Sequence, residues 1–161
     1  MKYRLSRFFS GMLCAVLLVS APLLSSCQKK DVVLDVTAVA DALKAQVPFV
    51  DTLDAATDSG VERTYTALNA EDVKAKVVYT GSGATAEEIA VFEAVDKDAA
   101  ARVKAAVDKH IEETRESFTD YNPEELNKLK DPVVVTEGVY VILCVSDDNA
   151  KAKSCVDGFL K

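Results

Sequence analysis

The chain has 161 residues and carries 26 acidic against 19 basic side chains, a formal charge of −7 with its one histidine neutral. An acidic surface repels nucleic acid and anionic lipid headgroups, so we expect neither as a partner. Hydrophobic residues make up 49% of the chain, which is enough to build the core of one domain of this size.

The N-terminal segment has the pattern of an export signal. Lys2, Arg4 and Arg7 give it a basic start, and a mainly apolar stretch follows from Phe8 to Leu24. This stretch is short for a membrane-spanning helix, which needs about 20 consecutive apolar residues. We therefore predict that residues 1–26 are a signal peptide.

The signal ends in Leu24-Ser25-Ser26-Cys27, which resembles the lipobox of bacterial lipoproteins. The resemblance implies that Cys27 is lipidated and becomes the first residue of the mature protein, so that its acyl chains hold the protein on a membrane. An uncleaved anchor or an ordinary secretory signal is the alternative. Removing 26 of 161 residues leaves 135, with 16 basic against 26 acidic side chains and a charge of −10. Residues 27–36 are then the lipidated cysteine and a short tether.

Two further cysteines remain in the mature chain, Cys144 and Cys155. Outside the cytoplasmic membrane a disulfide between them could persist. It would close a loop of roughly 12 residues and contribute about 3 kcal/mol in the chain-entropy model. The alternative is two buried, reduced thiols that pack as small apolar side chains.

We expect residues 37–161 to form one domain that begins with a helix. Thr37 is predicted as its N-cap, and Pro48 ends it because the residue before a proline avoids helical dihedral angles. Its apolar residues fall on one helical stripe: Val39, Ala40, Leu43 and Val47. Within residues 49–69 the pattern predicts only a short helical turn, at about residues 61–68.

The next two segments predict a hairpin. Residues 73–80 alternate as a strand does, and Gly81-Ser82-Gly83 interrupts them. Residues 86–95 are ambiguous, because Thr85-Ala86-Glu87-Glu88 fits a capping box that starts a helix, whereas the segment from Ile89 to Val95 is rich in strand formers. We favour a strand, which would pair with residues 73–80.

A long helix is predicted next, from an N-cap at Asp98 to about Phe118. Its apolar stripe consists of Val103, Val107, His110, Thr114 and Phe118. Pro123 then starts a short second helix.

A second hairpin follows, from Val133 to Thr136 and from Val139 to Val145, with Glu137-Gly138 as its turn. The returning strand is apolar on both faces and is therefore predicted to be central in the sheet. Ser146 or Asp147 would cap a last helix, whose apolar stripe is Ala152, Cys155, Val156 and Phe159.

These elements predict an α+β fold. From residue 73 the order is ββα-ββα, preceded by an N-terminal helical segment. Antiparallel hairpins followed by helices indicate an antiparallel sheet of about four strands with helices on one face.

No set of residues in the sequence has the spacing of a catalytic or metal site. His110 is the only histidine and lies on the apolar helical stripe, so we interpret it as a packed or boundary residue. Gly81-Ser82-Gly83 matches neither a phosphate loop nor a nucleophile elbow. Two acidic stretches lack the spacing of a calcium loop and are interpreted as solvated faces: Asp51, Asp54 and Asp58, and Glu112, Glu113, Glu116 and Asp120. We expect no cofactor, no metal and no enzymatic activity.

Three segments, in order along the chain, support a family resemblance: Gly83 to Ala94, Phe118 to Glu125, and Gly138 to Asp147. Together they resemble the domain-of-unknown-function 4358 family of bacterial, mainly Firmicutes, small lipoproteins. The resemblance implies a Gram-positive cell surface and a strand at Ile89. The family has no assigned activity, so it implies no functional residue.

We therefore expect a membrane-anchored extracytoplasmic lipoprotein on the outer face of the cell membrane. Its predicted role is to bind an envelope protein, a peptide or a small ligand without catalysis. One alternative is an envelope hydrolase that uses surface carboxylates, which two acids facing each other in a cleft would favour. The other is a structural subunit of an envelope complex, which a large exposed apolar patch would favour.

Overall fold

The computed structural model describes residues 32–161, so the predicted signal peptide and Cys27 lie outside the described residues. Its centre is a five-stranded antiparallel sheet with strand order β1-β2-β3-β5-β4. The strands are β1 Asp54–Ala55, β2 Val73–Thr80, β3 Glu88–Ala94, β4 Val133–Glu137 and β5 Tyr140–Val145.

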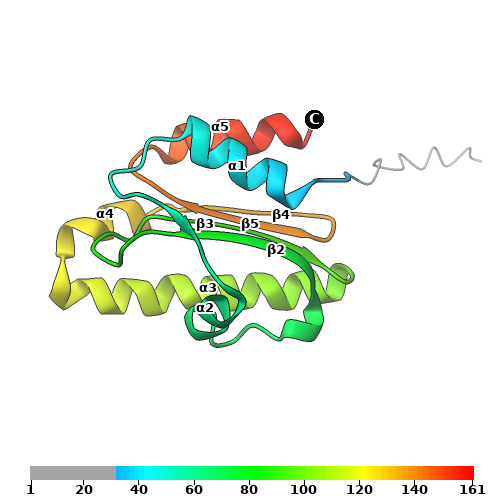
Figure 1. The fold of residues 1–161 in the computed structure, drawn as a ribbon, viewed down its shortest axis with the longest axis horizontal. Coiled ribbons are helices and arrows are strands. Elements are labelled where there is room, and N and C mark those ends of the chain that lie inside the picture. The colour runs from blue at the N-terminus through cyan, green and yellow to red at the C-terminus, as the bar shows by residue number, and fades with distance from the viewer. Residues whose placement is uncertain (1–31) are drawn as a thin grey trace, which may run out of the picture. The chain divides into compact units, whose positions relative to one another are not determined.

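Five helices pack against this sheet (Figure 1). They are α1 Val36–Gln46, α2 Asp58–Thr64, α3 Lys97–Tyr121, α4 Leu126–Leu129 and α5 Asn149–Phe159. The element order confirms the predicted α+β fold and its ββα-ββα arrangement, with one short strand more than expected. None of the described helices is long and apolar enough to cross a membrane.

The helices cover both faces of the sheet, which corrects the expectation of one covered face. Helices α1 and α5 lie on one face, and α2 and α3 lie on the other (Figure 1). The reason lies in β3 and β5, where successive buried residues alternate between two cores. Ile89 and Val91 pack with α1 and α5, whereas Ala90 and Phe92 pack with α3. A sheet that is apolar on both faces needs a helical layer on each.

Strand β3 confirms the strand interpretation of residues 86–95. It pairs with β2 on one side and with β5 on the other, so that Ile89 lies between Tyr79 and Cys144. Strand β5 is central, as predicted. The β4–β5 turn is shifted by one residue, because Glu137 pairs with Tyr140 and leaves Gly138 and Val139 as the loop. Gly138 has a φ of +60°, which favours glycine.

The helix N-caps also lie close to the predicted positions but not on them. Asp35 caps α1 in place of Thr37, and its carboxylate accepts hydrogen bonds from the backbone of Thr37 and Ala38. Asp96 caps α3, and Asp148 caps α5. In each case an aspartate within two residues of the predicted cap reaches the free N–H groups of the first turn.

Both cysteines of the described chain are free thiols. Cys144 is buried in β5, and Cys155 on α5 packs against the same core. Burial raises the pKa of the Cys144 thiol to about 12 and also raises the pKa of Cys155. The possible disulfide between them is not formed in this structure, and the alternative of two reduced thiols that pack as apolar side chains describes it.

Candidate functional site

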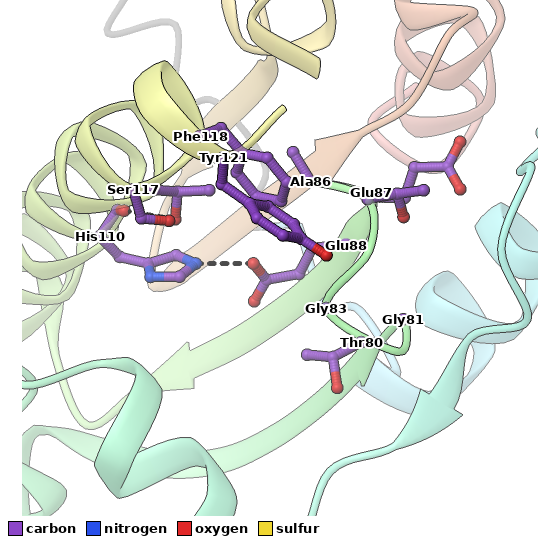
Figure 2. A pocket seen from close by; sticks show the side chains of 12 residues that line it. Thr80, Gly81, Gly83, Ala86, Glu87, Glu88, His110, Ser117, Phe118 and Tyr121 are labelled. Atoms are coloured by element: carbon purple, nitrogen blue, oxygen red, sulfur yellow. Dashed lines mark hydrogen bonds and ion pairs between the residues drawn. The ribbon is translucent and has the colours of Figure 1, made fainter. Parts of the chain in front are cut away.

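A pocket of about 290 Å³ opens at one end of the sheet (Figure 2). One wall is the β2–β3 loop, residues 81–87, and the other is the C-terminal half of α3. Glu88, the first residue of β3, also lines it. Helix α3 contributes five side chains from one helical face, most of them three or four residues apart: His110, Thr114, Ser117, Phe118 and Tyr121.

At the inner end of the pocket, Glu88 forms the centre of a buried hydrogen-bond network. The Tyr65 hydroxyl donates to Glu88 Oε1 at 2.5 Å, and His110 Nε2 lies 2.6 Å from Glu88 Oε2. The rings of Tyr65 and His110 are 4.4 Å apart, and Tyr65 meets Phe92 edge to face at 5.3 Å. Three distant segments of the chain therefore converge on one carboxylate.

The charges in this network favour the protonated form of His110. Burial alone would lower the pKa of His110. The hydrogen bond and charge of Glu88, with smaller contributions from Glu113 and the backbone of Thr64, outweigh it and raise the pKa above its usual 6.5. Burial and then the charge of Glu88 raise the pKa of Tyr65 well above its ordinary range, so the phenol stays a donor.

This arrangement leaves His110 poorly placed for proton transfer. One of its ring nitrogens meets Glu88, and the ring also hydrogen-bonds the backbone of Thr64. A general base needs a free lone pair within reach of the proton that it removes. Because His110 uses its nitrogens within the protein, its role is to hold Glu88 and α3 together.

The loop wall of the pocket is fixed from behind by two carboxylates. Asp51 accepts hydrogen bonds from the backbone N–H and the hydroxyl of Ser82, each at 2.6 Å, which lowers the pKa of Asp51. Glu87 accepts from the backbone N–H groups of Val50 and Asp51 at 2.8–3.0 Å. The shape of the wall is therefore established before any ligand arrives, which lowers the entropic cost of binding.

A buried lysine neutralises the acids behind this loop. Lys128 Nζ lies 3.1 Å from Glu87 Oε1, 3.0 Å from Glu125 Oε2 and 3.7 Å from Asp147 Oδ2. Burial would lower the pKa of Lys128, but Glu125 and Glu87 outweigh it and raise the pKa, so the amine stays charged. Glu125 in turn accepts from the backbone N–H of Ala86 at 2.9 Å. This cluster ties α4 to the loop.

Residues 50–146 match the family described as Domain of unknown function (DUF4358). The chain belongs to the DUF4358 family. The match begins after α1 and ends before α5, so the DUF4358 segment contains the whole sheet, the pocket and, apart from Asp147, the Lys128 cluster. No curated protein and no solved structure matches the chain.

The two acidic stretches do not come together in the DUF4358 fold. Asp58 pairs with Lys76 at 2.7 Å, and Asp51 holds the pocket loop. On α3, Glu112 pairs with Arg115, and Glu113 with Lys109. Among residues 32–161 no group of three or more His, Cys, Asp or Glu side chains could hold a metal ion.

Glu87 and Glu88 are the central polar residues of this site, and the sequence pattern did not predict them as such. They come directly before an apolar run, and adjacent residues of a strand point to opposite faces. Two adjacent buried acids, one directly before β3 and one at its first residue, must therefore each find a partner in a different place. That signal was present in the sequence, although it does not identify the partners.

Gly81→Ala is expected to destabilise the domain by about 1–3 kcal/mol, the usual cost of forcing a methyl group into occupied space. A Cβ at this position would lie 2.6 Å from Asp51 Oδ2, so Asp51 would have to release Ser82. Urea denaturation measures the loss. Gly158→Ala in α5 is the control, because its Cβ meets no atom within 4 Å, and it should stabilise by up to about 1 kcal/mol. Equal midpoints for the two variants would contradict the close approach.

Proposed function

We propose that this DUF4358 protein is a lipid-anchored, extracytoplasmic binding module. In this proposal Cys27 holds it on the outer face of the cell membrane, and the pocket beside Glu88 receives a ligand at the cell envelope. The observation that supports it most is positional: the pocket lies at the end of the sheet opposite to the end where the described chain enters the domain.

Helix α1 provides this separation. Beyond its C-terminal end come Val50 and Asp51, whose backbone N–H groups bind Glu87 next to the pocket. The helix has 11 residues, which at 1.5 Å each span about 16 Å. Its N-terminal end lies toward the β4–β5 hairpin (Figure 1). The pocket and the point where the described chain enters α1 therefore lie at opposite ends of the sheet (Figure 1).

The side chains of the pocket support binding over catalysis. A hydrolase of the carboxylate type needs two acids that face each other across the substrate. Here Glu88 is held by His110 and Tyr65, and Glu87 turns away from the pocket toward Lys128 (Figure 2).

Cys27→Ser is expected to abolish membrane attachment, because it removes the thiol that would carry the acyl chains. The test is metabolic labelling with a fatty-acid analogue, followed by separation of membrane and soluble fractions. Wild type should carry the label and sediment with membranes, and Cys27→Ser should do neither. The same label on both proteins would refute lipidation at this residue.

The pocket is tested separately, with the anchor intact. Tyr121→Ala changes an exposed side chain at the pocket mouth and should leave the fold and the membrane fraction unchanged. Cross-linked capture from native membranes should then lose partners that wild type retains. Val95→Ala, at the opposite end of β3, is the matched control. Identical capture by Tyr121→Ala and wild type would argue against the pocket as the binding site.

A further inference from the structure

We propose that the pocket recognises the ammonium group of a small organic amine, held between the Glu88 carboxylate and the ring of Tyr121. This inference rests on the proposed binding role and specifies the chemistry of the ligand.

The charged groups that line the pocket favour a cation. Among the described residues of its lining none is lysine or arginine. The titratable groups there are the acids Glu87 and Glu88 and the single histidine His110, whose proton offsets the charge of Glu88 until the pH rises through the pKa of His110. Glu87 turns its carboxylate away to Lys128, so Glu88 is the acid that faces the pocket (Figure 2). The chain as a whole is acidic, with a formal charge of −7. An anionic ligand would be repelled by this field, and a cation attracted.

The hydrogen-bonding groups of the pocket favour a ligand that donates hydrogen bonds. Each oxygen of Glu88 receives one hydrogen bond, from Tyr65 and from His110. A carboxylate oxygen can accept two, so each retains an acceptor site. Thr114 donates its own hydroxyl proton to the carbonyl of His110 at 2.8 Å, which leaves its oxygen as an acceptor. A primary ammonium group offers three donors to this set.

The aromatic side of the pocket supplies the second contact. Tyr121 lines the mouth and is 69% exposed, and its ring lies 5.9 Å from that of Phe118. In Figure 2 the Tyr121 ring projects from α3 toward the side of the pocket where Glu88 lies. A cation over the face of a tyrosine ring gains cation–π attraction, and the apolar part of an amine can pack against Phe118.

The network beneath the pocket gives this recognition a pH signature. The groups that face His110 are Glu88 on β3, Tyr65 after α2, the backbone of Thr64, and Glu113 on α3 itself. A ligand cation beside Glu88 competes with the proton on His110 for the same negative charge. Amine binding should therefore release protons from His110, and it should become tighter as the pH rises through the pKa of His110.

The test uses the full-length protein in detergent micelles and two probes of the same shape, benzylamine and benzyl alcohol. Isothermal titration should show benzylamine binding at least about tenfold more tightly than the alcohol, since only the amine carries the charge. Tyr121→Ala should weaken benzylamine several-fold, while Tyr121→Phe and Val95→Ala should bind as wild type does. Benzylamine affinity should rise as the pH increases above 6.5 through the raised pKa of His110, and this rise should disappear in His110→Gln.

The possible results separate this inference from the proposed function. Equal affinities for the amine and the alcohol would overturn ammonium recognition and leave a pocket that binds uncharged ligands. No binding of benzylamine would also overturn it, while loss of cross-linked partners in Tyr121→Ala would still support a binding module. Because Tyr121 is exposed, its variants keep the test valid even if changes at His110 impair folding.

Discussion

Lys128→Met is expected to lower the unfolding free energy by about 3–5 kcal/mol, because removal of one partner leaves buried charges uncompensated. Lys128 is 6% exposed, and its amine lies within 3.1 Å of the carboxylates of Glu87 and Glu125. Glu87 accepts hydrogen bonds from the backbone of residues 50 and 51, and Glu125 accepts one from the backbone of Ala86. Methionine fills a similar volume, so the loss would come from the charge. Chemical denaturation followed by circular dichroism measures it.

Lys130→Met is the matched control. Lys130 is exposed, and the one contact described for its amine is a hydrogen bond to the side chain of Asn127. Lys130→Met should therefore change the unfolding free energy by no more than about 0.5 kcal/mol. Adding Glu87→Gln to Lys128→Met should recover part of the stability, because it removes one of the stranded charges. A double variant that is less stable than either single variant would show that the carboxylate contributes mainly through its backbone hydrogen bonds.

The predictable part of this fold is the part that short-range periodicity encodes. Alternation predicted β2, and the 3.6-residue spacing predicted the core face of α3, including His110 at its edge. The same reasoning recognised that Val139 to Val145 is apolar on both faces. The buried residues of β3 also alternate between two cores. Because this second strand was not recognised as apolar on both faces, all helices were predicted on one face.

The residues that bind Glu87 and Glu88 could not be predicted, because these are contacts between segments far apart in the sequence. Glu88 meets His110 and Tyr65, which are 22 and 23 residues away in opposite directions along the chain. Hydrophobic periodicity says which side of an element is buried, but not which distant polar group shares its position. The acidic pair at the start of β3 could have been recognised as buried, yet the choice of His110 for one and Lys128 for the other follows only from the fold.

The two buried networks at this end of the sheet have different roles. Glu87 and Lys128 fix the loop from behind, on the side away from the pocket, and Glu88 with His110 and Tyr65 forms its inner surface. Because consecutive strand residues point to opposite faces, one pair of adjacent glutamates supplies both. Substitutions at these two neighbouring positions therefore disturb two different networks.

Glu88→Gln is expected to cost about 2–4 kcal/mol, with the largest loss at mildly acidic pH. In the folded protein the pKa of His110 is raised above 6.5 by Glu88, so the protonated pair contributes stability that is fully present below pH 6.5. This contribution is lost as the pH rises through the folded pKa of His110. The variant lacks it at every pH, and the difference between wild type and Glu88→Gln should therefore shrink as the pH increases across this window. Urea titrations at a series of pH values measure the difference.

Glu93→Gln is the control on the same strand, because Glu93 pairs with the exposed Lys74. Its cost should stay below about 1 kcal/mol, since an exposed ion pair contributes little, and it should not vary across the same pH window. His110→Gln should remove the pH dependence from both proteins and make Glu88→Gln equally costly throughout. A Glu88→Gln penalty that grows with pH would reverse the expected sign, and it would show that the neutral histidine, not its protonated form, is the species that Glu88 stabilises.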